Sequence, residues 1–135
     1  MLRLLSVLAL TACAVVGTSS PNTKVVKSGE DFELSPTETA IVDQGAVTLT
    51  LVKVNEDSRC PIDVQCVWAG DVALALLVGT NSNARNPSTI HTNLDPRTTI
   101  ADGYKIEAVS VQPAPRSQST IPQSSYRITF RVSRQ

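Results

Sequence analysis

The sequence predicts an all-β fold: an antiparallel β-sandwich, Ig-like in outline, with a small β-barrel as the alternative. Short segments rich in Val, Ile, Leu and Thr alternate with clusters of Gly, Pro, Asn, Asp and Ser, which is typical of strands joined by turns. No window longer than about ten residues carries a 3.6-residue apolar period free of Gly and Pro, so no long helix is expected. Segment 125–133 alternates apolar and polar residues throughout, as a half-buried strand does.

The predicted strands are each bounded by turn residues and lie, in chain order, at 30–34, 39–42, 46–55, 71–79, near Ile90, and at 97–100, 104–112 and 125–133. Asp43-Gln44-Gly45 is a turn signal, and Asp102-Gly103 suits a hairpin turn. Segment 71–79 is apolar at odd and even positions alike, which indicates a central strand covered on both faces. Three prolines exclude 112–123 from a sheet interior.

The amino terminus predicts export. Met1-Leu2-Arg3 carries a positive charge and 4–10 is apolar apart from Ser6, which is typical of a secretory signal. The run is too short to cross a bilayer of about 30 Å as a helix. Leu10-Thr11-Ala12-Cys13 resembles a bacterial lipobox, in which the cysteine becomes the lipidated first residue of the mature protein. The alternative is a soluble secreted protein in which Cys13 has no such role.

A lipobox divides the chain into a signal peptide at 1–12, the lipidated Cys13 with a flexible tether at 13–28, and a single β domain at 29–135. One acyl chain binds a membrane marginally and two or more anchor stably, so a Cys13 carrying palmitate-type chains would be a permanent tether. We therefore expect a lipoprotein of the bacterial cell envelope, with its domain in the periplasm or at the cell surface. Ala14 after the lipidated cysteine favours the outer membrane over the inner.

Charge and motifs argue against several functions. Twelve Lys and Arg balance twelve Asp and Glu, and loss of Arg3 with the signal leaves eleven against twelve. Without a basic block, neither nucleic acid nor an electrostatically bound membrane surface is expected, and the lipid on Cys13 is the membrane contact predicted. The chain has no G-x-S-x-G elbow, Gly-rich phosphate loop or calcium loop. We expect a protein without catalytic residues, cofactor or metal.

Cys60 and Cys66 are expected to form a disulfide. With Cys13 assigned to lipid, they are an even pair in an oxidising compartment. Their C-x5-C spacing, with a single histidine in the chain, fits neither a zinc site nor a C-x-x-C redox centre. Closure of so short a loop stabilises the fold by about 2.4 kcal/mol through the entropy of the unfolded chain.

The candidate binding residues lie around this loop: Arg59, Asp63 and Trp68. In an extended chain Trp68 shares a face with Cys66, so it is expected to pack on the disulfide or cap one end of the sandwich. The alternative is an exposed Trp at an interaction surface, where this residue type is favoured. Asp57 and Arg59 are expected to bracket the loop entrance, and short Asp side chains here bond nearby backbone amides.

The segments Glu56-Asp57-Ser58-Arg59-Cys60-Pro61 and, four residues later, Cys66-Val67-Trp68-Ala69-Gly70 resemble a pattern in uncharacterised bacterial lipoproteins and secreted proteins. The likeness extends through His91-Thr92, Pro113-x-Pro115 and the strand holding Tyr126, and so covers most of 30–133. This resemblance implies export and a shared β domain, and it implies no catalytic or binding mechanism for this protein. Ala114 stands where an aromatic residue is commoner, which weakens this proline segment as a binding tip.

Three functions are compatible with these residues. The first is a non-enzymatic, lipid-anchored module that binds an unknown protein or small ligand. The second is a protease inhibitor that presents the Cys60–Cys66 loop, with Asp63 or Val64 as the contact residue, because a closed loop lowers the entropic cost of binding. The third is a hydrolase that uses His91 with an acidic partner, although a lone loop histidine is more often a surface or turn residue.

Overall fold

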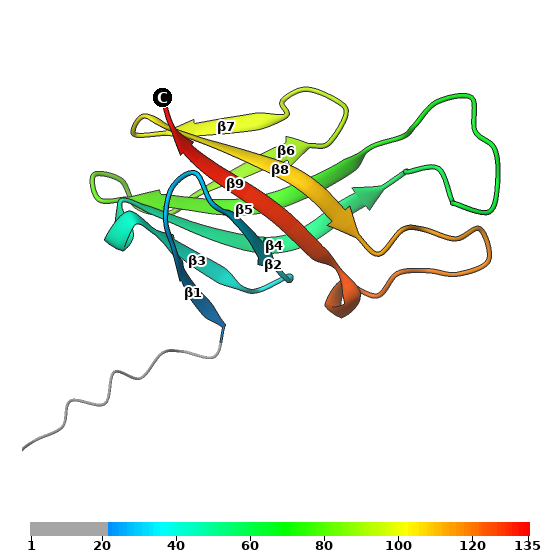
Figure 1. Cartoon of the computed structure of the whole chain (residues 1–135), viewed down its shortest axis with the longest axis horizontal. Coiled ribbons are helices and arrows are strands. Elements are labelled where there is room, and N and C mark those ends of the chain that lie inside the picture. Colours follow the sequence, from blue (N-terminus) through cyan, green and yellow to red (C-terminus); the bar gives the residue numbers. More distant parts are fainter. Residues whose placement is uncertain (1–21) are drawn as a thin grey trace, which may run out of the picture.

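The computed structural model describes residues 22–135, which form two packed β-sheets (Figure 1). One sheet has five strands in the order β1-β3-β4-β5-β6, and the other has four in the order β2-β9-β8-β7. The strands are β1 Thr23–Val26, β2 Asp31–Leu34, β3 Thr39–Val42, β4 Val47–Asp57, β5 Val72–Thr80, β6 Asn86–His91, β7 Thr98–Ala101, β8 Tyr104–Gln112 and β9 Arg127–Arg134. The predicted β-sandwich is confirmed, and the sheets of this described part do not close into a barrel.

The core lies between the two sheets and is built from alternate residues of the long strands. Its largest fully buried side chains include Leu34, Leu49, Leu51, Leu74, Leu76, Ile90, Ile106, Ile128 and Phe130. The predicted alternation of the last strand is confirmed, and Phe130 stacks on Phe32 of β2 with ring centroids 6.3 Å apart. The outer face of β5 is only partly covered, since Ala75 and Leu77 are half-buried, so the expectation of cover on both faces holds in part.

Strand β1 corrects the predicted boundary between tether and domain. Thr23–Val26 lies within the expected tether 13–28, yet it pairs in parallel with β3, Thr23 beside Thr39. This parallel pair also departs from an all-antiparallel sandwich. Lys24 and Val25 are exposed, so the segment has no apolar alternation from which a strand could be recognised.

Two β-bulges in β4 turn its last residues toward the core. The register against β5 shifts between Leu51 and Lys53 and again between Val54 and Glu56. A bulge adds one residue to a strand, so the inward positions of β4 come every third residue here instead of every second. Leu51, Val54 and Asp57 thereby pair with the core residues Leu76, Leu74 and Val72. The bulges bring Asp57 into the end of the sandwich, where its carboxylate meets other elements.

Three connections meet at this end of the molecule: residues 58–71 between β4 and β5, 92–97 between β6 and β7, and 113–126 between β8 and β9 (Figure 1). Ile62 donates from its amide to Pro115 O at 3.0 Å, and the Asn93 side chain donates to Gly70 O, so the three are hydrogen-bonded to one another. Among the described residues, no helix has the length and apolar character needed to span a membrane.

Candidate functional site

Residues 58–71 form a projecting loop closed by the Cys60–Cys66 disulfide, as predicted (Figure 1). The Cα atoms of the two cysteines lie 5.8 Å apart. At the neck of the loop the Ser58 amide donates to Asp71 O at 2.8 Å, and the Cys60 amide donates to Ala69 O at 3.2 Å. The loop therefore leaves the sheet as a short hydrogen-bonded ladder and ends in a covalent ring.

Replacing both Cys60 and Cys66 by serine is expected to lower the free energy of unfolding by about 2 kcal/mol, because the unfolded chain regains the entropy that the ring removes. Denaturant unfolding under non-reducing conditions measures this. Reduction of the unmodified protein should give the same loss, since neither cysteine is among the buried core residues. Equal midpoints for the reduced and oxidised proteins would contradict the prediction.

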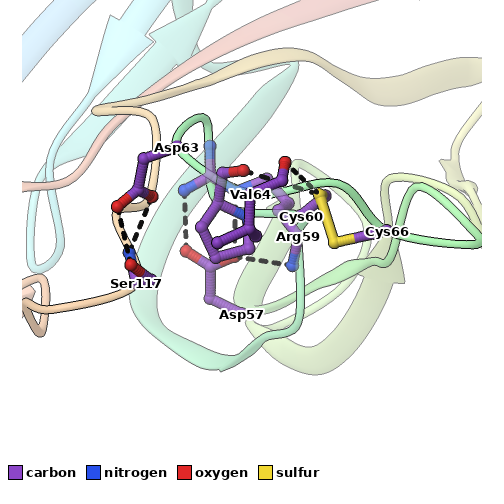
Figure 2. The surroundings of a disulfide bond; sticks show 8 residues. Asp57, Arg59, Cys60, Asp63, Val64, Cys66 and Ser117 are labelled. Atoms are coloured by element: carbon purple, nitrogen blue, oxygen red, sulfur yellow. Dashed lines mark hydrogen bonds and ion pairs between the residues drawn. A yellow bond between two sulfur atoms is a disulfide. The ribbon is translucent and has the colours of Figure 1, made fainter.

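Arg59 fastens the loop to two other segments (Figure 2). Its Nε and Nη2 donate to the two oxygens of the Asp57 carboxylate at 2.8 and 2.6 Å. Its Nη1 donates to Val111 O and its Nη2 donates to Pro113 O, each at 2.9 Å. The Arg59 and Asp57 side chains are only 17% and 11% exposed. The predicted bracket at the loop entrance is confirmed, and the Arg59 guanidinium is engaged within the protein.

Tyr126 completes this cluster from the residue just before β9. Its hydroxyl donates to Asp57 Oδ2 at 2.9 Å. Burial, together with the Asp57 carboxylate, raises the pKa of Tyr126 to about 12. Burial also works to raise the pKa of Asp57, but the hydrogen bonds from Arg59 and Tyr126 outweigh it, so the pKa of Asp57 lies below its ordinary value. Asp57 is therefore a carboxylate that joins β4, β9 and the loop.

Asp63 makes a second attachment, to the loop between β8 and β9. Its two oxygens accept hydrogen bonds from the Ser117 amide at 2.9 Å and the Ser117 hydroxyl at 2.6 Å (Figure 2). These bonds lower the pKa of Asp63. The expected bond from Asp63 to a backbone amide is present, but its partner is 54 residues away along the chain. Ser117 was not a candidate residue, since nothing in its local sequence marks it.

A third carboxylate, Asp71, holds the neighbouring loop at 92–97. It is buried, and its Oδ2 lies 2.6 Å from His91 Nδ1. Its Oδ1 accepts from the Asn93 amide at 2.8 Å and the Leu94 amide at 3.2 Å. His91 thus has an acidic partner, as the hydrolase hypothesis requires, but no hydroxyl within residues 22–135 is hydrogen-bonded to its ring. The pair is suited to fixing a turn.

Asp71 makes the stability of the fold sensitive to acid. Burial alone would raise its pKa, but hydrogen bonds from the Asn93 amide and His91 bring the pKa from 3.8 down to about 2. A carboxylate whose pKa is lower in the folded chain than in the unfolded chain stabilises the fold at pH values above its unfolded pKa. This stabilisation is lost as the pH falls through the folded pKa. The melting temperature of the unmodified protein should therefore fall between about pH 4 and pH 2, and it should fall less in Asp71→Asn. The same fall in both proteins would contradict this prediction.

The far part of the loop carries exposed apolar side chains. Trp68 is 70% exposed, so the expectation that it packs on the disulfide or caps the sandwich is wrong. Trp68 follows the disulfide ring on a loop that projects from the end of the sandwich, and its side chain is not part of the core (Figure 1). Ile62, Val64 and Val67 of the same loop are exposed as well. We call these four residues, Ile62, Val64, Val67 and Trp68, the apolar tip.

A hollow of about 460 Å³ lies beside the apolar tip. Its walls come from Ile62 and Ala69 of the disulfide loop, Asn93 of the β6–β7 loop, and Val109 and Pro115 of β8 and the loop that follows. Val109 is the extra residue of a bulge in β8, between Ala108 and Ser110, and it is exposed there. The tip and the hollow together make the candidate binding surface.

A larger hollow, of about 590 Å³, lies at the opposite end, between β1, Asp43 and Arg134. The Asp43 carboxylate accepts from Ser28, Tyr104 and Arg134 at 2.8 to 3.2 Å. These bonds, led by the Ser28 amide, hold the pKa of Asp43 far below its ordinary value. Because the Asp43 carboxylate and the Arg134 guanidinium at the centre of this hollow are bonded to each other, we place the candidate site at the tip instead.

Of the three predicted binding residues, Arg59 and Asp63 therefore anchor the loop, and Trp68 is exposed on its surface. Arg59 and Asp63 face the protein, whereas Trp68 faces outward. No three His, Cys, Asp or Glu side chains within residues 22–135 are grouped as a metal site would need. Comparisons of the chain with models of protein families, with curated proteins and with solved structures find no match.

Proposed function

We propose that this protein is a lipid-anchored, non-enzymatic module of the bacterial envelope that binds its partner through the apolar tip. The single observation that carries the proposal is the exposure of Trp68 on a loop that is closed by a disulfide. Scattered exposed apolar residues are ordinary on protein surfaces. Four of them on one projecting loop, including the only tryptophan of the chain, form a feature that binding surfaces use.

The anchoring of the loop supports this proposal. The disulfide, the Arg59 contacts and the Asp63–Ser117 pair hold the loop from three directions. A loop that is already ordered loses little conformational entropy when it binds. Arg59 and Asp63 are then positioning residues for the tip, and the tip makes the contact.

The protease-inhibitor alternative receives less support. A substrate-like inhibitor presents an extended strand whose backbone groups pair with the protease. Here the Ile62 amide donates to Pro115 O at 3.0 Å and the Val64 amide donates to Pro61 O at 3.3 Å, so the ring is a turn with its amides engaged. The Asp63 side chain, one of the two expected contact residues, is bonded to Ser117.

A crosslinking experiment on the full chain in bacterial cells tests the proposal. Trp68 is replaced by a photoreactive phenylalanine derivative, and Ile100 of β7, which is exposed at a distance from the tip, is replaced in the same way as a control. Light should produce adducts with an envelope component from position 68 and not from position 100. If neither position gives an adduct, or both give the same one, the tip is not a binding surface.

The anchor is tested separately. Cys13→Ser should move the protein from the membrane fraction to the soluble fraction, because the residue that would carry the lipid is lost. The comparison is repeated in an Ile62→Asp background, which weakens any membrane contact of the tip; if the proteins with Cys13 and with Cys13→Ser distribute alike there, the lipid-anchor part of the proposal fails.

A further inference from the structure

We infer that the partner of the apolar tip is a lipid bilayer: the tip inserts between the headgroups and upper acyl chains of the membrane that holds Cys13. The inference rests on the proposed function and names its ligand. It adds a second, apolar membrane contact to the lipid anchor, which the sequence alone did not predict.

The chemistry of the tip suits the interface of a bilayer. Tryptophan has a large apolar ring with one N–H donor, and it is enriched where hydrocarbon meets water. Val64, Val67 and Ile62 offer aliphatic surface beside it, all exposed. A short loop of this kind can reach into the headgroup region and cannot span the membrane.

Two of the three carboxylates of the loop, Asp57 and Asp71, are held within the protein, and the third, Asp63, is exposed and turned toward Ser117 (Figure 2). Asp57 is paired with Arg59, Asp63 is bonded to Ser117, and Asp71 is bonded to His91. The residues of the ring and its outer arm, 60–70, otherwise carry no charge. Asp63 stays exposed and charged, so the tip can enter only to a depth at which this carboxylate remains among the hydrated headgroups, because burying an unpaired charge would cost too much.

The direction of the chain brings the tip and the anchor to the same side. Strand β1 runs parallel to β3, with Thr23 beside Thr39, and Thr39 lies opposite Thr50 of β4. From Thr50, β4 continues away from β1 for about 23 Å at 3.3 Å per residue before the loop begins. The chain therefore enters β1 from the side of the sandwich toward which the tip projects.

The length of chain before β1 is matched to this arrangement. Roughly ten residues, 13–22, lie between the lipid-bearing cysteine and Thr23, and they reach at most about 33–36 Å. Fully extended, that reach is about the same as the roughly 33 Å from Thr50 to Cys60, ten residues at about 3.3 Å each, so a lipid on Cys13 can lie level with the start of the disulfide ring that carries part of the apolar tip. A protein partner at the same tip would not need this match.

The inference is tested with Trp68 itself, because it is the only tryptophan of the chain and reports from the tip alone. The full-length Cys13→Ser protein, purified with its disulfide intact, is mixed with phosphatidylcholine vesicles. The emission of Trp68 should shift to shorter wavelength, and lipids brominated near the headgroup end of the acyl chain should quench it. An unshifted, unquenched emission at saturating lipid overturns the inference.

A matched pair of variants shows which surface binds. Ile62 and Ile100 are each 59% exposed, the first in the tip and the second on β7. Ile62→Asp should lower vesicle partitioning by about tenfold, because the buried isoleucine surface is lost and a charge is added at the interface. Ile100→Asp should leave partitioning within about twofold. Equal losses in the two variants would mean that the tip is not the contact.

The lipid composition separates apolar insertion from electrostatic attraction. Since no basic cluster lies in the tip, partitioning should change less than about threefold between phosphatidylcholine vesicles and vesicles containing phosphatidylglycerol, and little with salt. A strong dependence on either would overturn the inference. If Trp68 gives photo-adducts with an envelope protein while vesicles leave its emission unchanged, the proposed function stands and the lipid partner is wrong.

Discussion

Replacing Gly70 by alanine should lower the free energy of unfolding by at least about 3 kcal/mol, the largest effect expected of any single methyl group in this protein. Gly70 has φ +74°, where a side chain is strained. An alanine Cβ at this position would also lie 1.9 Å from Ser58 O and 2.8 Å from Arg59 Cα. Both are backbone atoms at the neck of the disulfide loop, so the neck itself would have to open.

Gly103 is the matched control for this substitution. It has φ +79°, nearly the same backbone conformation, but nothing lies within 4 Å of a Cβ placed there. Gly103→Ala should therefore cost only the strain of the left-handed conformation, about 1–2 kcal/mol. Denaturant unfolding of both variants measures the difference. If the two variants are equally destabilised, the close approach at Gly70 contributes nothing.

Arg59→Met should destabilise the protein by about 3 kcal/mol, because it leaves the largely buried Asp57 carboxylate without its cation and Val111 O and Pro113 O without a donor. Methionine fills much of the same volume, so the loss reports hydrogen bonds and charge more than packing. The free energy of unfolding at pH 7 measures it. A change below about 0.5 kcal/mol would falsify the anchoring role.

The pH dependence of the same variant gives a second readout. In the unmodified protein the pKa of Asp57 is low, so acid removes stability. In Arg59→Met, the burial that raises the pKa of Asp57 is opposed only by the Tyr126 hydroxyl and the backbone amide of residue 59. Arg59→Met should then recover part of its deficit as pH falls from 7 to 4, and Arg59→Met/Asp57→Asn should be more stable at pH 7 than Arg59→Met alone.

Most strands could be predicted because their signals are local. The bounds of β3 and β8 agree with the predicted segments 39–42 and 104–112. The extension of β4 to Asp57 could not be predicted in the same way, since it depends on bulges that appear only in register with β5. Strand β1 could not be predicted either. It is a strand because it pairs with β3, and its own side chains, two of which are exposed, show no alternation that would indicate this.

The candidate site could be predicted in its disulfide and in the Asp57–Arg59 bracket at the loop entrance. The disulfide follows from the number of cysteines, whereas the exposure of Trp68 depends on how the loop leaves the sandwich, which its local sequence does not determine. The bonds that hold the loop join residues far apart in the chain: Asp63 and Ser117 are separated by 54 positions, and Arg59 and Val111 by 52. Local spacing contains no information about such contacts.

The parallel pairing of β1 has a mechanical consequence. Tension applied to the chain ahead of Thr23 pulls β1 along its own axis, so the bonds of the four residue pairs it forms with β3 are loaded together in shear. An edge strand pulled across its axis would instead unzip one bond at a time. In a protein tethered through this end, pulling by a moving membrane would be resisted at the first strand before the core is disturbed.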